Sequence, residues 1–246
     1  MTHDATGQHD SLHAALATVR ARIAAAARTA QRDPDSITLL LAVKTLPATR
    51  IREAIAAGGT LIGQNRAQEL TATEPQLEDL PHQTHFIGHL QSNKAGQVSR
   101  WVDCVQTVDS IALAQRLNRV QPQHSSHPLG VMVQVNTSAE TTKSGVSPTA
   151  ALELAADIAQ LPALHLRGFM TIGANSPDTG RVRASYEALA HVRASVHQAG
   201  IAGAEDAQQL SMGMSGDLEL AIGAGATMIR VGSAIFGARP PGPPAE

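Results

Sequence analysis

The sequence predicts an α/β fold, a single (β/α)8 barrel of the TIM type with an extra N-terminal helix. Short apolar segments and helical segments alternate about eight times, and each pair takes roughly 25 residues, as in such barrels. No long linker rich in proline, glycine or serine interrupts this alternation, so the 246 residues fit one domain. The alternative, an open doubly wound sheet, usually carries a G-x-G-x-x-G loop after its first strand, and that loop is missing here.

The chain begins with a predicted amphipathic helix at residues 10–32, where Leu12, Leu16 and Val19 fall at helical spacing. Eight short apolar strands follow it, and right-handed crossovers would make them parallel. The predicted strands are Ile37–Thr45, Thr60–Gln64, Thr84–Leu90, Val102–Val108, Val131–Asn136, Leu166–Ile172, Gln209–Met214 and Met228–Gly232.

Helical segments lie between these strands. Several begin after proline, serine or aspartate, and several end at glycine, which are the usual signals for helix ends. The predicted helices are Ala48–Gly58, Ser92–Val98, Ser110–Val120, Pro148–Gln160, Gly180–Gly200 and Gly216–Gly225. We therefore expect the barrel to span residues 10–239, with a flexible N-terminus at 1–9 and a disordered Pro-rich tail at 240–246.

The composition argues against several classes of function. The formal net charge is −2, which gives no reason to expect nucleic acid or an anionic membrane as a partner. No apolar stretch reaches the roughly 18 residues of a membrane span, and the polar N-terminus lacks the pattern of a secretory signal. Cys104 is the single cysteine, so no internal disulfide can form. We expect a cytoplasmic protein with Cys104 as an inert core residue.

Lys44 stands near the end of the apolar run LLLAVKT, in the first predicted strand. Burial disfavours the ammonium form of a lysine, and a lysine with a lowered pKa forms Schiff bases with carbonyl compounds. A lysine at a strand end can also simply extend its amine into solvent. This segment by itself leaves both interpretations open.

Closure of the barrel would place Lys44 beside the last strand, at the carboxyl ends where TIM barrels carry their functional residues. Arg230 shares one face of that strand with Met228 and Gly232, because side chains alternate along a strand. Gly232-Ser233 leads into a short predicted helix, where such barrels often bind phosphate through backbone N–H groups. An amine, an arginine and a phosphate cradle together fit pyridoxal 5'-phosphate. A Schiff-base aldolase acting on a sugar phosphate would have less use for the arginine.

Several longer motifs make the chain resemble the pyridoxal phosphate homeostasis protein family. They occur in matching order and cover nearly the whole chain, from about Ile37 to Arg239. The resemblance implies the barrel of the alanine racemase N-terminal domain and a bound pyridoxal 5'-phosphate. The motifs are AVKT ending at 45, IGQNRAQEL at 62–70, HFIGHLQSNK at 85–94, NTSAETTKSGV at 136–146, LRGFMTIG at 166–173, LSMGMSGDLELAI at 210–222 and IRVGSAIFGAR at 229–239.

The resemblance also implies which residues bind the cofactor. Lys44 is expected to hold it as an internal aldimine, and Arg230 is expected at the pyridine nitrogen. Ser211, Gly232 and Ser233 are expected around the phosphate, and Asn65 is expected to contact the cofactor from the rim.

Three positions depart from the usual pattern of the family. Gln64 stands where a glutamate is usual, Arg66 where a tyrosine is usual, and Leu46 where a second lysine is common. These replacements leave the predicted cofactor-binding residues unchanged, and we assign no role to the three positions.

Catalysis with this cofactor needs a second acid or base that moves protons on the substrate. Racemases that resemble this fold carry a second domain after the barrel, whereas this sequence ends soon after the eighth predicted strand. Tyr186 is the only tyrosine, and it lies in a predicted outer helix, so it is a poor candidate for that base. The sequence therefore predicts no catalytic residue.

We thus predict a non-catalytic, monomeric protein that binds pyridoxal 5'-phosphate and buffers it or delivers it to apo-enzymes. Such a protein would maintain intracellular cofactor levels and the balance of amino and keto acids. An amino-acid racemase of the alanine racemase type is the alternative. Lys143, which follows the fifth predicted strand, could accept the cofactor transiently on release.

Three histidines, His82, His85 and His89, have a spacing that suggests a metal site. Only His85 and His89 would share a face of a strand, and no acidic or cysteine residue stands beside them. We therefore predict no metal site and expect ordinary rim and loop histidines.

Overall fold

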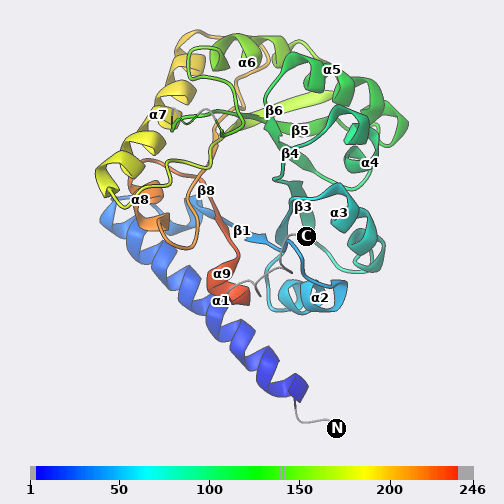
Figure 1. Cartoon of the computed structure of the whole chain (residues 1–246), viewed down its shortest axis with the longest axis vertical. Helices are drawn as coiled ribbons and strands as arrows, with labels where there is room; N and C mark the ends of the chain where they lie inside the picture. The colour runs from blue at the N-terminus through cyan, green and yellow to red at the C-terminus, as the bar shows by residue number, and fades with distance from the viewer. Residues whose placement is uncertain (1–3, 139, 141, 238–246) are drawn as a thin grey trace.

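The computed structural model describes residues 4–138, 140 and 142–237. It is a closed barrel of eight parallel strands in sequential order, with the helices on the outside (Figure 1). This confirms the predicted (β/α)8 barrel. The strands are β1 (Thr38–Ala42), β2 (Leu61–Gln64), β3 (Gln83–Phe86), β4 (Cys104–Val108), β5 (Leu129–Gln134), β6 (Leu164–Met170), β7 (Gln209–Ser211) and β8 (Met228–Val231).

The helices follow the strands in the expected alternation. They are α1 (Asp4–Thr29), α2 (Ala48–Ala56), α3 (Ala67–Thr73), α4 (Ala95–Ser99), α5 (Ile111–Val120), α6 (Ala151–Ala159), α7 (Thr179–Gln198), α8 (Leu218–Gly223) and α9 (Ser233–Phe236). Short 3-10 turns cover Pro34–Ser36, Glu74–Gln76, Ser92–Lys94 and Gln121–Gln123. Within the described residues, no helix is long and apolar enough to cross a membrane.

The extra N-terminal helix is present as α1, which begins at Asp4 and ends at Thr29. It runs along the outside of the barrel and packs on α8 and α9 (Figure 1). Its buried side chains are Leu12, Leu16, Val19, Ile23 and Ala27. The structure thus describes residues 4–9, part of the segment expected to be flexible, as helix. The end of the predicted barrel at residues 238–239 and the expected disordered tail lie outside the described residues.

Six of the eight predicted strands end earlier than expected, and shortly beyond β1 and β7 a residue adopts a left-handed backbone φ that a strand cannot continue. β1 ends at Ala42 rather than Thr45, and Thr45 has a φ of 64°. β7 ends at Ser211 rather than Met214, and Gly213 has a φ of 88°. Both turns bring the chain out onto the rim at the carboxyl ends of the strands.

Helix α3 was not predicted from the sequence. It has seven residues, and Arg66 at its N-cap makes no side-chain cap bond. A short segment with two threonines and no cap lacks the signals by which helices are found in a sequence. This helix matters because it carries Glu69 onto the rim.

The barrel has two apolar layers. The larger layer lies between the strands and the helices, and a small cluster fills the barrel interior. The interior cluster consists of Leu40, Leu61, Cys104, Met132, Met170 and Met228. Cys104 is thus a core residue as predicted, and burial raises the pKa of its thiol to about 12, which keeps it protonated.

Closure of the barrel joins β1 to β8. Leu40 pairs with Arg230 and Leu41 with Val231. The carboxyl ends of the first and last strands therefore meet, which positions the segments after Ala42 and Val231 side by side.

Candidate functional site

Arg230 is a buried cation inside the barrel. It lies on β8 with 6% of its surface exposed. One terminal nitrogen donates to Ser211 Oγ at 2.9 Å, and the other donates to the backbone oxygen of Thr171 at 2.8 Å. Burial lowers the pKa of Arg230 to about 10, and the fields of Tyr186 and Asp217 oppose this shift. The guanidinium therefore stays charged at neutral pH, with neutral oxygens as its two acceptors.

A chain of hydrogen bonds runs from Arg230 across the barrel. The Ser211 hydroxyl donates to Gln106 Oε1 at 2.6 Å, and Gln106 Nε2 donates to His85 Nδ1 at 2.7 Å. Arginine can only donate, so each following group in the chain accepts from the group before it. His85 Nδ1 is then an acceptor, and its ring proton stays on Nε2. The chain joins β8, β7, β4 and β3 and fixes the orientation of Arg230.

His85 lies in the barrel interior, so the expectation of an ordinary rim or loop histidine is wrong for this residue. It is 7% exposed, and burial lowers its pKa to about 4, with a further contribution from Arg167. His82 instead bonds Glu74 on the outside of the barrel. Among the residues that the structure describes, no three His, Cys, Asp or Glu side chains gather as a metal ion would require.

Tyr186 lies on the outer helix α7, as predicted, but its side chain is fully buried. Its hydroxyl donates to Asp217 Oδ2 at 2.8 Å. A Cβ placed on Gly173 would come within 2.6 Å of the Tyr186 ring, so the loop after β6 lies directly on this ring. Burial, with the neighbouring Asp217 charge, raises the pKa of the phenol, which therefore keeps its proton.

Lys44 lies in a turn beyond β1 and is exposed. Of the two interpretations that the sequence leaves open for Lys44, the structure supports exposure, because β1 ends two residues before it and the turn carries Lys44 to the rim. The next residue, Thr45, adopts the left-handed backbone region, and its N–H donates to Glu69 Oε2 at 3.0 Å. Glu69 Oε1 accepts from Arg66 at 3.3 Å.

The segment after β8 forms the short helix α9, as predicted, with Gly232 at its N-cap. A Cβ on Gly232 would come within 3.0 Å of the Ala42 backbone oxygen. The ends of β8 and β1 thus approach so closely that only a glycine fits without a shift. The N–H of Ala234 donates to Ser215 Oγ at 3.3 Å, while Ser233 is exposed.

The two remaining predicted binding residues, Asn65 and Ser211, differ in how deeply they are buried. Asn65 follows β2 and is half-buried, and its Oδ1 is a buried oxygen with no hydrogen-bond partner among the described residues. Ser211 is fully buried and bonds Arg230 and Gln106. The contact that the structure gives Ser211 is thus with the arginine, and its predicted phosphate contact stays a prediction.

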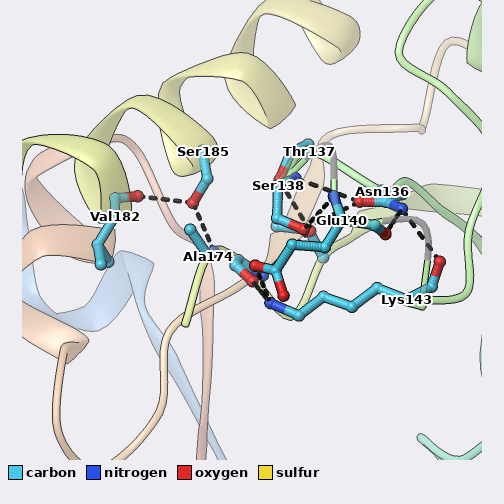
Figure 2. Close-up of polar contacts among 10 residues, drawn as sticks. Asn136, Thr137, Ser138, Glu140, Lys143, Ala174, Val182 and Ser185 are labelled. Carbon is cyan, nitrogen blue, oxygen red and sulfur yellow. Dashed lines mark hydrogen bonds and ion pairs between the residues drawn. The ribbon is translucent and has the colours of Figure 1, made fainter. Parts of the chain in front are cut away.

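Lys143 is held in a compact polar turn after β5 (Figure 2). Its amine donates to Glu140 Oε1 at 2.9 Å and to the Gly173 backbone oxygen at 2.8 Å. Asn136 Nδ2 donates to the backbone oxygens of Glu140 and Lys143 at 2.8 and 3.0 Å. The side chain of Lys143 is 19% exposed, and its two acceptors fix the direction of the amine.

The sequence did not identify Gln106, Thr171 or Glu69 as part of this site. Gln106 had a detectable signal, because it is a polar residue within the apolar strand CVQTV. A buried polar side chain needs a hydrogen-bond partner. That partner, Ser211, lies 105 residues away in the sequence, so only the folded barrel reveals the pair.

Comparison of this sequence with known proteins identifies several that are similar over most of their length. The family described as "Alanine racemase, N-terminal domain" matches residues 14–240. The pyridoxal phosphate homeostasis protein of Pseudomonas aeruginosa is 44% identical over 231 residues, which cover 94% of this chain and 97% of that protein. The protein of the same name from Escherichia coli K12 is 43% identical over 231 residues, with 91% and 95% covered. The resemblance indicated by the motifs is thus confirmed.

Comparison of structures agrees. PipY of Synechococcus elongatus, solved with pyridoxal phosphate bound, has a TM-score of 0.78 and 32% identity over 92% of this chain and 100% of that chain. A protein from Bifidobacterium adolescentis has a TM-score of 0.89 and 38% identity, covering 96% and 98%. Alanine racemase from Corynebacterium glutamicum, at 14% identity and a TM-score of 0.65, shares the fold over 95% of this chain and 62% of its own.

The buried His85 gives a prediction for stability against pH. Its folded pKa of about 4 lies below the ordinary value of 6.5, so the unfolded chain binds a proton that the folded chain does not. Stability is therefore lost as pH falls from 6.5 to 4, by roughly 3 kcal/mol in total. In His85→Gln, a side chain that can still accept from Gln106, this loss disappears.

Urea unfolding at neutral pH and near the lower end of this window measures the effect. The loss of unfolding free energy on acidification is expected to be smaller in His85→Gln than in the wild type by about 2–3 kcal/mol. His191→Gln, on an exposed position of α7, is the matched control and is expected to behave as the wild type. Equal losses in the wild type and His85→Gln would contradict the buried neutral histidine.

Proposed function

We propose that this chain binds pyridoxal 5'-phosphate. The chain belongs to the alanine racemase N-terminal-domain family and, within it, to the pyridoxal phosphate homeostasis proteins. In this proposal it acts as a non-catalytic carrier, which buffers the cofactor or delivers it to apo-enzymes. The observation that supports this best is a buried arginine, Arg230, below a rim that carries an exposed lysine and the start of α9.

The residues present fit this cofactor. Arg230 donates two hydrogen bonds within the described chain, although a guanidinium has five N–H groups, so it can donate further to a ring nitrogen. Lys44 presents an amine on the same rim, and pyridoxal 5'-phosphate supplies an aldehyde that bonds covalently to amines. Gly232 and Ser233 are proposed for the phosphate, and the unpartnered Oδ1 of Asn65 for a polar contact at the rim.

Arg230 would make the cofactor ring a weak electron sink, and by itself it does not separate a carrier from a racemase. A guanidinium donates a hydrogen bond and never accepts one, so the ring nitrogen that faces it stays unprotonated. An unprotonated pyridine withdraws electrons weakly, which limits its use as an electron sink. The chain through Ser211 and Gln106 holds the guanidinium in this donating orientation.

The racemase alternative requires a second base near the cofactor. Tyr186 does not fit that role, because its phenol donates to Asp217 and its raised pKa keeps it protonated. The likeness to alanine racemases is a likeness of fold at 14–16% identity. We therefore favour the carrier, acting as a monomer, over the racemase.

The experiment for the binding site is reduction of the loaded protein with borohydride, followed by peptide mapping. We expect a yellow protein whose visible absorbance changes on reduction, with the pyridoxyl mass on Lys44. Lys44→Ala should lose the label, whereas Lys94→Ala, which removes a half-buried lysine of the turn after β3, should keep it. Label mainly on another lysine would contradict the assignment of Lys44.

Lys143 is proposed as the residue that accepts the cofactor transiently during release. Its amine is oriented by Glu140 and Gly173, and its side chain is partly exposed. We expect Lys143→Ala to slow the transfer of pyridoxal 5'-phosphate to a dependent apo-enzyme, measured as the rate at which that enzyme gains activity. An unchanged transfer rate in Lys143→Ala would count against this role.

A further inference from the structure

Glu69 links the lysine turn, which is the turn after β1 that carries Lys44 and Thr45, to a separate part of the rim. It belongs to α3, which follows β2, and its carboxylate accepts a hydrogen bond from the Thr45 N–H at 3.0 Å. The Glu69 side chain is 23% exposed, and the bond to Thr45 lies at the solvent-exposed rim. One carboxylate therefore joins the loop after β1 to the helix after β2 at the residue next to Lys44.

The turn that Glu69 holds is a strained one. Thr45 has a φ of 64°, in the left-handed region that β-branched residues rarely adopt. Such a conformation persists only where the surrounding structure fixes it. The contacts that fix this turn are the Glu69 bond and a bond from the Leu46 N–H to the Val43 backbone oxygen at 3.1 Å.

The direction of the Lys44 side chain depends on this turn, because Lys44 and Thr45 share a peptide bond. The Thr45 hydroxyl also donates to the Lys44 backbone oxygen at 2.6 Å. If Thr45 relaxed to an ordinary negative φ, the peptide and the Lys44 side chain would rotate away from their present position on the rim.

We propose that Glu69 is a positioning residue for Lys44, acting as a hydrogen-bond acceptor that fixes the strained turn and so sets how tightly the cofactor is held. This inference rests on the proposed function. The bond that forms joins Lys44 Nζ to the aldehyde carbon of the cofactor and releases one water molecule. Its equilibrium depends on where the amine stands, and the Glu69 contact determines that position.

Two variants of Glu69 distinguish the effect of losing a hydrogen-bond acceptor from the effect of losing a negative charge. Glu69→Gln keeps an oxygen that can accept from Thr45 and removes the charge, whereas Glu69→Ala removes both. Arg66→Ala is the matched control, because it removes the other partner of the Glu69 carboxylate and leaves the Thr45 bond in place. Equal urea midpoints would establish that all three variants are folded to the same extent as the wild type.

The measurement is a titration by visible absorbance with pyridoxal 5'-phosphate and, separately, with pyridoxal, which lacks the phosphate. Glu69→Ala is expected to bind both ligands about tenfold more weakly, the size of one charge-assisted hydrogen bond. Glu69→Gln should stay within about threefold of the wild type, and Arg66→Ala within about twofold. Wild-type affinity in Glu69→Ala, or equal losses in Glu69→Gln and Glu69→Ala, would overturn the proposal. A loss confined to the phosphorylated ligand would overturn it as well.

Thr45→Gly provides a second test, because it changes the strained residue itself and not only Glu69. Glycine adopts a positive φ without strain, so the turn should then need Glu69 less. In the Thr45→Gly background, Glu69→Ala should cost about threefold or less. A full tenfold loss in that background would contradict the strained-turn account. If the wild type binds neither ligand covalently, both the proposed function and this inference are wrong. If the wild type binds normally and Glu69→Ala binds with the same affinity, only this inference is wrong.

Discussion

The pairing of β1 with β8 is the constraint on which the site depends. In this register Leu40 lies opposite Arg230, so the two strands reach the rim together. The lysine turn follows one strand and α9 follows the other, and Gly232 lets their backbones approach to within contact distance. Without closure, an amine at position 44 and a helix start at position 233 would lie at opposite edges of a sheet.

The buried charge of Arg230 gives the site its chemical character. No carboxylate bonds the guanidinium among the described residues, because its acceptors are a hydroxyl and a backbone oxygen. Asp217 acts on it only through its field and is itself bonded by Tyr186. Because its acceptors are neutral groups, the guanidinium keeps further N–H groups that can donate hydrogen bonds to a ligand. It donates these hydrogen bonds without transferring a proton to the ligand. These two properties suit binding a pyridine ring whose nitrogen stays unprotonated.

The fold was predictable because the alternation of eight strands and helices is a local pattern, and the adjacency of Lys44, Arg230 and Gly232 followed from closure alone. The depth of Lys44 was not predictable, since a left-handed Thr45 leaves no signal in a sequence of β-branched and apolar residues. Helix α3 was missed because it is short and uncapped. The hydrogen-bond chain from Arg230 to His85 was not predicted, because its members come from four strands. The position of Tyr186 on an outer helix was predicted, but the burial of its side chain was not.

We propose a site that binds pyridoxal 5'-phosphate and lacks, among the described residues, a second base for substrate chemistry. The most direct measurement follows the loss of the α-proton of L-alanine, and the appearance of D-alanine, in the presence of the loaded protein. The account predicts rates no higher than those of the same concentration of free pyridoxal 5'-phosphate. Steady turnover at rates typical of enzymes, about 1–1000 per second, would contradict it.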